Sequence, residues 1–285
     1  MTLSVSGGTA VDLRVESVED VLEHVEQALH VHMDRETVVR KRRSVGARTD
    51  RQSWVRIERR GLDRIGTQGW NGTECAAVLD GIAKPAWCAA VAWRDRAAPA
   101  MWRADETSLL PGAPIGSSVL AVDPQLSEAW WRALNASLDA LAAQHTSRVA
   151  TPDTVLITQP VVTEAVQNAF GSGFDTAIST WVPAHADLNW ANVSGPEFCL
   201  FDWEDWGNAP QGLDSASLWG SSLAVPALAD RVRRERRGDL ESRDGMLMTL
   251  FAFSKFAGPD AHPEDPRVEP ARLEAARIVA ELQAR

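Results

Sequence analysis

The 285-residue sequence predicts an α+β protein of two lobes, a small N-terminal lobe with an antiparallel sheet and a mainly helical C-terminal lobe. Helical and strand periodicities alternate as far as residue 106, and helical periodicity dominates beyond it. The segment PGAPIG, residues 111–116, interrupts regular structure between the two parts because it is rich in proline and glycine. We therefore expect lobes over residues 1–106 and 107–285.

The N-terminal lobe is expected to contain a helix, two strands, a second helix and two more strands. Apolar residues recur with a helical period over residues 17–32, where Ser17 is placed as the N-cap. Residues 37–40 and 53–57 are rich in β-forming side chains and flank a polar turn, which favours a hairpin. A helix over residues 71–83 and two strands, AAVAWRD and PAMWRAD, complete this lobe.

The C-terminal lobe is expected to be helical around two short polar segments. Residues 127–144 place tryptophan and leucine on one broad face of a helix, and residues 270–284 are again helical in character. Between these helices lie HADLNWAN, residues 185–192, and FDWEDW, residues 201–206, which resemble the edges of strands. Polar side chains within such apolar segments are candidates for a functional site.

The overall charge argues against a protein dedicated to nucleic acid. The net charge is −10, from 29 basic and 39 acidic residues, whereas nucleic-acid-binding domains are usually basic. Basic residues are concentrated in residues 40–64, where there are ten of them and three acidic ones. This segment suits an anionic ligand, and the acidic remainder suits a cationic one; solvated strand faces are the alternative explanation.

Cysteine usage and the N-terminus predict a cytoplasmic protein. Cys75, Cys88 and Cys199 are odd in number and lack the spacing of a metal site, which favours buried free thiols in a reducing compartment. The N-terminus lacks the charged and apolar regions of a secretion signal, and no apolar run is long enough to span a membrane. We therefore expect neither secretion nor membrane insertion.

Two carboxylates and an asparagine in the polar segments form a set suited to a nucleotide with Mg²⁺. Asn192 and Asp202 offer the hard oxygen ligands that Mg²⁺ prefers beside phosphate oxygens. Asp187 then remains free of the metal, and such a carboxylate can orient a substrate hydroxyl and accept its proton. His185 lies two residues earlier and is better suited to holding the loop through hydrogen bonds than to reacting.

The two polar segments resemble the motifs of a known family. HADLNWAN matches the pattern His-x-Asp-x-x-x-x-Asn, and FDWED matches an apolar-Asp-Trp-Glu pattern. Both patterns are typical of the aminoglycoside phosphotransferase and choline kinase family, which has a bilobal protein-kinase-like fold. The family usually has glycine between the histidine and the aspartate and histidine two positions after the aspartate, whereas this chain has Ala186 and Asn189.

The resemblance implies roles for individual residues. It makes Asp187 the catalytic base, Asn192 and Asp202 the Mg²⁺ ligands and His185 a structural member of the loop. Further along, GLDSASLW places Asp214 where the family has an aspartate that braces the catalytic loop from a following helix.

The N-terminal lobe resembles the family in the order of its elements and departs from it in one residue. The nucleotide-binding lysine that the family carries on its third strand has no counterpart here. Arg56 occupies the best-suited position, with Glu74 on the following helix as its expected ion-pair partner. The alternatives are an exposed strand arginine, whose role Arg59 or Arg60 could fill, and an ordinary glutamate on the helix surface. Arginine binds phosphate as a planar fork and not as a compact point charge. Glu204 and Asp205 are candidates to face the substrate, with solvated loop acids as the alternative.

The resemblance implies an enzyme that moves the γ-phosphoryl group of ATP or GTP to a hydroxyl of a small molecule with the help of Mg²⁺. The acidic lobe suits a cationic acceptor such as an aminoglycoside or another amino-bearing antibiotic, and hence a role in antibiotic resistance. Sugars, amino alcohols and nucleoside-type antibiotics stay open as acceptors.

Three alternatives follow from features that depart from this interpretation. The missing lysine leaves open a catalytically silent kinase-like protein that binds a nucleotide or small molecule. A metal-dependent hydrolase that uses His185 is disfavoured because the C-terminal lobe offers only His145 and His262 besides it. A protein kinase is disfavoured because Asp-Trp-Glu replaces Asp-Phe-Gly and because residues 202–214 contain no evident activation segment.

Overall fold

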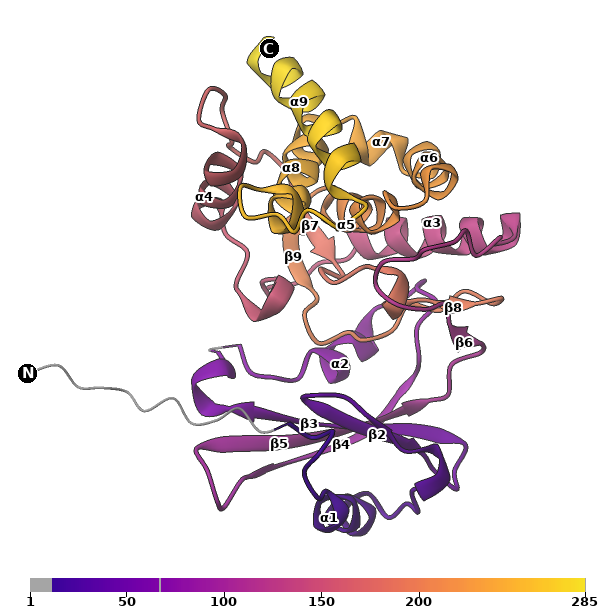
Figure 1. Ribbon diagram of the computed structural model, residues 1–285. Coiled ribbons are helices and arrows are strands. Elements are labelled where there is room, and N and C mark those ends of the chain that lie inside the picture. The colour runs from indigo at the N-terminus through magenta and orange to yellow at the C-terminus, as the bar shows by residue number, and fades with distance from the viewer. Residues whose placement is uncertain (1–11, 67, 285) are drawn as a thin grey trace, which may run out of the picture. The chain divides into compact units, whose positions relative to one another are not determined.

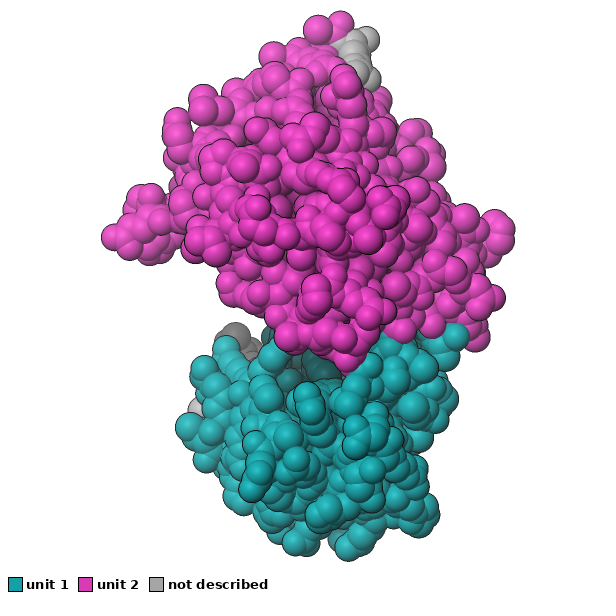
Figure 2. Space-filling model, turned by 90° about the vertical axis from the view of Figure 1, so that its right-hand side faces the viewer, with its two compact units in different colours: residues 1–77, 85–109 teal, residues 78–84, 110–285 magenta. Residues whose placement is uncertain are grey.

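A computed structural model describes residues 12–66 and 68–284, which divide into two compact units (Figures 1 and 2). Unit 1 contains the described residues up to Ala77 together with Pro85–Leu109, and unit 2 contains Val78–Lys84 and the described residues from Leu110 onward. The expected α+β class is confirmed. Residues 78–84, which we expected in the N-terminal lobe, belong to unit 2.

Unit 1 is built on an antiparallel five-stranded sheet whose strands lie in the order β1-β2-β3-β5-β4. The strands are β1 Val39–Arg40, β2 Ser44–Arg48, β3 Ser53–Gly61, β4 Trp87–Arg94 and β5 Ala100–Ser108. The last two confirm the expected pair of strands. The expected hairpin between residues 37–40 and 53–57 does not form directly. β3 pairs instead with β2, which covers residues that the sequence predicted to be a turn because of Gly46.

Gly46 lies inside β2 because an aromatic ring covers it. A Cβ atom added at this position would lie 2.7 Å from Cζ2 of Trp54. Glycine within a strand often marks such a close approach of another group to the backbone. The glycine therefore makes room for an indole ring and does not form a turn.

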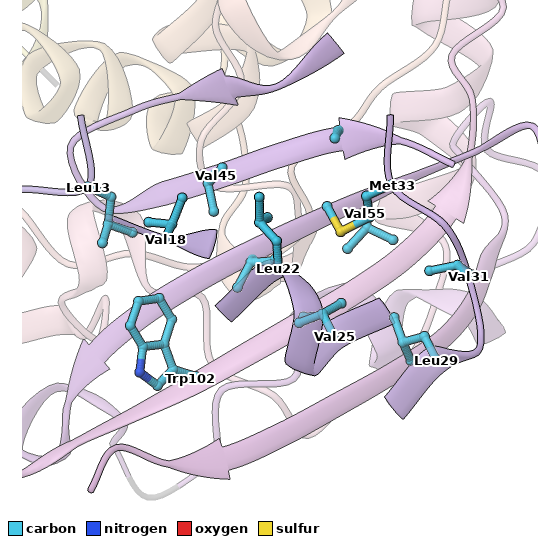
Figure 3. Packing of buried hydrophobic residues seen from close by; sticks show 13 residues of the cluster. Leu13, Val18, Leu22, Val25, Leu29, Val31, Met33, Val45, Val55 and Trp102 are labelled. Carbon is cyan, nitrogen blue, oxygen red and sulfur yellow. The ribbon is translucent and has the colours of Figure 1, made fainter. Parts of the chain in front are cut away.

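Helix α1, Glu19–Leu29, covers one face of this sheet with its apolar side (Figure 3). Leu22 and Val25 are buried in a cluster that includes Val55 and Trp102 of the sheet. The expected N-cap is wrong, because the helix begins after Val18, which makes no side-chain cap. Val18 is itself buried in the cluster, so apolar packing sets the start of this helix.

The second helix is much shorter than expected. α2 covers only Gly72–Cys75 and continues as a 3-10 turn over Ala76–Val78. Gly81 has a φ of +74°, which an α-helix cannot contain, so the predicted helix over residues 71–83 is interrupted. Beyond it the backbone N–H of Ala83 donates to Oγ of Ser137 in unit 2.

Unit 2 is mainly helical, and the two helices predicted from periodicity are confirmed as α3 and α9. Its helices are α3 Glu128–Ala142, α4 Gln159–Phe170, α5 Leu213–Ser222, α6 Pro226–Glu235, α7 Arg237–Leu240, α8 Arg243–Ala257 and α9 Val268–Ala284. Ser127 caps α3 by accepting a hydrogen bond from the backbone N–H of Trp130. Helices α5 and α8 meet through the rings of Trp219 and Phe253, whose centroids lie 5.6 Å apart.

Two small antiparallel ribbons complete unit 2. β6, Ala113–Pro114, pairs with β8, Ser194–Gly195, and β7, Trp181–Ala184, pairs with β9, Gly207–Pro210. β6 lies within the proline- and glycine-rich segment 111–116, which is otherwise irregular as expected.

The cysteines are free, as expected, but they differ in burial. Cys199 is buried, and this burial raises the pKa of its thiol to about 12. Cys75 is half-buried, and Cys88 is exposed in β4, so the expected burial is wrong for Cys88. Among the described helices, none has the length and apolar character needed to cross a membrane. The N-terminal residues on which we based the absence of a secretion signal lie outside the described part of the chain.

Candidate active site

The strand pair β7–β9 brings the two polar segments together. HADLNWAN begins immediately after β7, and FDWEDW ends immediately before β9. Ala184, the last residue of β7, lies opposite Gly207, the first residue of β9. Segments separated in sequence therefore meet at one end of the ribbon, so they adjoin strands as the sequence predicted.

Two buried aspartates hold the backbone on either side of β7. Asp214 in the first turn of α5 accepts hydrogen bonds from the backbone N–H groups of His185, at 2.7 Å, and Ala186, at 2.8 Å. Asp244 in the first turn of α8 accepts from the backbone N–H of Thr180 at 2.7 Å and from the Ser179 hydroxyl at 2.7 Å. Buried backbone donors need such acceptors, so these carboxylates fix the path of the chain into the polar segment.

Asp214 was expected from its motif, whereas Asp244 was missed. The available signal was the N-terminal pattern of α8, in which Ser242 is the N-cap and an aspartate follows in the first turn. This pattern predicts a helix start, but it does not reveal that the aspartate binds a distant strand.

The side chains of two asparagines hold the carboxylate of Asp187. Asn192 donates from Nδ2 to Oδ2 of Asp187 at 2.8 Å, and Asn189 donates from Nδ2 to Oδ1 at 3.0 Å. Both amides also donate to the backbone carbonyl of Asp187, at 2.8 and 3.0 Å respectively. Asn189 was noted in the sequence only as a departure from the family pattern, so its contact with the aspartate was missed.

The surroundings of Asp187 favour its protonated form. Burial raises the pKa of this carboxyl above its ordinary value, and the nearby carboxylates of Asp202 and Asp153 raise it further. His185 and the hydrogen bond from Asn192 act in the opposite direction. A carboxylate with a raised pKa is a stronger base, which suits the removal of a proton from a hydroxyl.

His185 joins the two polar segments. Its ring is fully buried, and Nε2 lies 3.0 Å from the backbone carbonyl of Phe201. Because a carbonyl oxygen only accepts hydrogen bonds, Nε2 carries the proton. The indole of Trp203 packs edge-on against this ring with 4.8 Å between centroids. This burial and these contacts suit a residue that holds the loop, as we expected.

Asp202 lies at a turn in the left-handed region, with a φ of +70°. The turn is held by Trp203, whose Nε1 donates to the backbone carbonyl of Leu200 at 2.8 Å, and by Phe201, whose N–H donates to the carbonyl of Asn192 at 3.0 Å. This last bond joins Asn192, one predicted metal ligand, to the residue that precedes Asp202, the other.

The oxygen atoms of Asn192 and Asp202 suit Mg²⁺ better than they suit a metal whose ligands are all protein side chains. Nδ2 of Asn192 points to Asp187, which leaves its Oδ1 available for a cation. One carboxylate and one amide oxygen match Mg²⁺, which usually completes its shell with water and substrate phosphates. Within the described ranges, no group of three or more His, Cys, Asp or Glu side chains is placed to hold a metal ion.

Ala186, where the family that the sequence resembles usually has glycine, has a strained backbone. Its φ is +71°, in the left-handed region that glycine enters without steric cost. An alanine there costs about 1–2 kcal/mol. The two hydrogen bonds accepted by Asp214 keep this backbone in place despite that cost.

Asp205 and Glu204 differ in their surroundings. Asp205 is buried, and its Oδ1 accepts a hydrogen bond from the Thr151 hydroxyl at 2.8 Å, so it is not a solvated loop acid. Glu204 is partly exposed. Contact of either carboxylate with a substrate stays a prediction.

In unit 1 the expected ion pair between Arg56 and Glu74 does not form. Nη1 of Arg56 instead lies 3.1 Å from Oε2 of Glu58, two residues along the same strand face. Glu74 accepts from Nη2 of Arg103 on β5, also at 3.1 Å. Arg103 is bound in addition by both oxygens of Asp105, each at 2.7 Å. Neighbours two residues along the same strand, and for Glu74 an arginine of β5, therefore decide which charges pair.

Among known proteins, only solved structures match this chain, and they define its fold. No protein-family model matches the chain, and none of the curated proteins matches it. Solved structures do match over almost the whole chain, and they place it in the kinase-like fold of the aminoglycoside phosphotransferases and choline/ethanolamine kinases. The predicted fold is thereby confirmed.

Three of these structures illustrate the likeness. The amicoumacin kinase hAmiN is 15% identical with a TM-score of 0.54, and the match covers 94% of each chain. A choline/ethanolamine kinase family protein from Mesorhizobium loti is 13% identical with a TM-score of 0.53, covering 90% of this chain and 92% of its own. Aminoglycoside phosphotransferase APH(4)-Ia is 10% identical with a TM-score of 0.56, covering 93% and 99%.

Proposed function

We propose that this protein is a small-molecule kinase that transfers the γ-phosphoryl group of ATP or GTP to a hydroxyl group in a reaction that requires Mg²⁺. The observation that carries the proposal is the carboxylate of Asp187, held by two amides beside the oxygens of Asn192 and Asp202. Its support is that this arrangement lies on a fold shared with proteins named as kinases and phosphotransferases of small molecules.

Asp187 orients the acceptor hydroxyl and takes its proton as the oxygen attacks phosphorus. Its raised pKa makes it a competent acceptor of that proton. Oδ1 of Asn192 and the carboxylate of Asp202 would hold Mg²⁺, which when bound supplies neutralisation of the phosphate charge. Asp214 and His185 keep the loop in position, and positioning contributes much of the catalysis in phosphoryl transfer.

The acceptor in this proposal is a hydroxyl compound that carries amino groups. The carboxylates of Asp153 and Asp202 act on Asp187, so the site has a negative field that favours a cation. Some relatives are consistent with such a ligand, since a mutant of APH(4)-Ia was solved in a ternary complex with AMP-PNP and hygromycin B.

The test is a screen for phosphorylated products. The full-length protein is incubated with Mg²⁺ and either ATP or GTP across a panel of hydroxyl-bearing antibiotics and metabolites, and mass spectrometry detects the gain of one HPO₃ group. An Asp187→Asn variant of the same shape serves as the control. We expect a product that depends on Mg²⁺ and is lost with the variant; no product with either nucleotide from folded protein would contradict the proposal.

A silent nucleotide-binding relative is the second candidate, and the charges of unit 1 favour it. Arg56, at the expected nucleotide position, is bound to Glu58, and its expected partner Glu74 is bound to Arg103 instead. Calorimetry with Mg²⁺-ATP separates the candidates when combined with the screen, because this relative would bind the nucleotide and yield no product.

A further inference from the structure

Asn189 makes more contacts with the catalytic segment than its place in the sequence suggests. Its Nδ2 donates to Oδ1 and to the backbone carbonyl of Asp187, both at 3.0 Å. Its Oδ1 accepts from the backbone N–H of Ala191 at 2.9 Å, which starts the 3-10 turn Trp190–Asn192. All three hydrogen-bonding sites at the end of this side chain are therefore used within the segment.

The bonds from Asn189 and Asn192 fall on different oxygens of Asp187. Asn189 binds Oδ1 and Asn192 binds Oδ2, so rotation of the carboxylate would break both bonds. An ionised carboxylate has about four lone-pair directions, and these two donors occupy one on each oxygen. The remaining directions are thereby fixed relative to the loop.

We propose that Asn189 is a positioning residue for Asp187, and that its amide and that of Asn192 form a clamp that fixes the carboxylate in the orientation needed to receive the acceptor proton. The inference rests on the proposed function and deepens it, because it assigns a role to the residue that departs from the family pattern. Fixing a base in a near-attack orientation removes rotational freedom before the reaction.

The chemistry of the side chain explains why asparagine suits this position. An amide carries two N–H donors and one acceptor oxygen on the same carbon, and the loop uses all of them. A neutral histidine has one donor and one acceptor, so it would lose at least one of the bonds to Asp187. An aspartate keeps the acceptor for Ala191 but places a second carboxylate against Oδ1.

Two variants separate the clamp from the turn that Asn189 caps. Asn189→Asp has nearly the same shape and keeps the bond from Ala191, whereas Asn189→Ala loses the cap as well as the clamp. If the clamp positions the base, kcat falls about 10-fold in Asn189→Ala and further in Asn189→Asp, while KM for the nucleotide changes by less than about 3-fold. An unchanged kcat in Asn189→Asp would overturn the proposal, because the clamp would then not orient the base.

Asn135→Ala is the matched control. This asparagine lies in α3 of the same unit and donates to Glu235 at 2.6 Å, away from the polar segments. We expect kcat to be unchanged in this variant. Thermal unfolding of all variants identifies any that do not fold, and Asn189→His, which retains one donor, then replaces Asn189→Ala with a smaller expected loss of kcat.

A second readout does not require an acceptor. Side-chain amide hydrogen exchange, followed by NMR in the full-length protein, reports directly on the clamp. We expect the Asn189 amide protons to be protected and to exchange at least about 10-fold faster in Asp187→Ala, because the bonded carboxylate is gone. Unprotected protons in the unaltered protein overturn the clamp, whatever the activity. Protected protons without any phosphorylated product leave the clamp in place and contradict the proposed function and, with it, the positioning role.

Discussion

The polar face of the unit 1 sheet and the two polar segments of unit 2 hold their charged groups by different means. In the sheet, charges pair with charges: Arg56 and Arg60 both bind Glu58, and Arg103 binds Asp105. At the polar segments, carboxylates are paired with neutral N–H donors, from the backbone for Asp214 of α5 and from asparagine amides for Asp187.

The difference teaches what the loss of one partner leaves behind in each region. In the sheet, the partner shared by Arg56 and Arg60 is the buried carboxylate of Glu58, so removing one member of these ion pairs leaves a charge without its counter-charge. A buried carboxylate that satisfies backbone donors has no substitute, because its removal leaves those donors unpaired at about 1–3 kcal/mol each.

The largest expected effect is that of Asp187→Ala, which tests the segment in which neutral donors fix a carboxylate. Without the base, kcat falls by about 10²–10⁴-fold, while KM for the nucleotide changes little. Steady-state kinetics with a confirmed acceptor measure this. Turnover equal to that of the unaltered protein would remove Asp187 from the mechanism.

The next largest expected effect is a loss of stability when either of the two aspartates that bind the backbone beside β7 is removed. Asp214→Ala and Asp244→Ala each leave two or more donors without their acceptor, so we expect each to lower the free energy of unfolding by about 2–5 kcal/mol. Urea denaturation followed by circular dichroism measures this loss. A change below about 1 kcal/mol at either site would contradict the contrast drawn between the two regions.

A charge pair in unit 1 should have a smaller effect that depends on pH. The guanidinium of Arg35 and the backbone N–H of Met33 bind Glu26 and, although burial opposes them, hold the pKa of its carboxyl below the ordinary value of 4.5. Stability from an acid with a lowered folded pKa is present above its unfolded pKa and is lost as pH falls through the folded one.

Glu26→Gln should therefore lower the free energy of unfolding by about 1 kcal/mol at neutral pH. The difference from the unaltered protein should shrink as pH is lowered below 4.5. Urea denaturation at several pH values measures it. A loss that stays constant down to the acid limit would show that charge is not its cause.

The smallest expected effect is a gain in the free energy of unfolding. Ala186→Gly relieves the left-handed backbone but adds freedom to the unfolded chain, so we expect a net stabilisation of about 0.5 kcal/mol. Thermal unfolding measures it against an alanine-to-glycine change in a right-handed helix, such as Ala140→Gly in α3, which should destabilise. A loss of stability in Ala186→Gly would show that the alanine is not strained.

Local sequence patterns predicted the elements that depend on side chains near one another in the chain. The periods of α3 and α9, the strands β4 and β5, and the spacing of the polar segments all come from side chains close together along the chain. The strand β2 was missed because Gly46 is explained only by an indole on the neighbouring strand. Glu74 was paired wrongly for the same reason, since Arg103 lies 29 residues away.

In the candidate site, the sequence did not predict hydrogen bonds between residues far apart in the chain, or contacts of residues that belong to no motif. Asp187, Asn192 and Asp202 follow from spacing, and the brace by Asp214 follows from a resemblance. Asp244 was not predicted because its partner lies 65 residues earlier, and no pattern in the sequence records that contact.

The position of Asp214 and Asp244 in the chain has a consequence for synthesis. The bonds that hold the backbone on either side of β7 come from residues 29 and 65 positions later. A growing chain that ends within the polar segments lacks both of these acceptors. We therefore expect the backbone on either side of β7 to be held in full only after α5 and α8 have been synthesised.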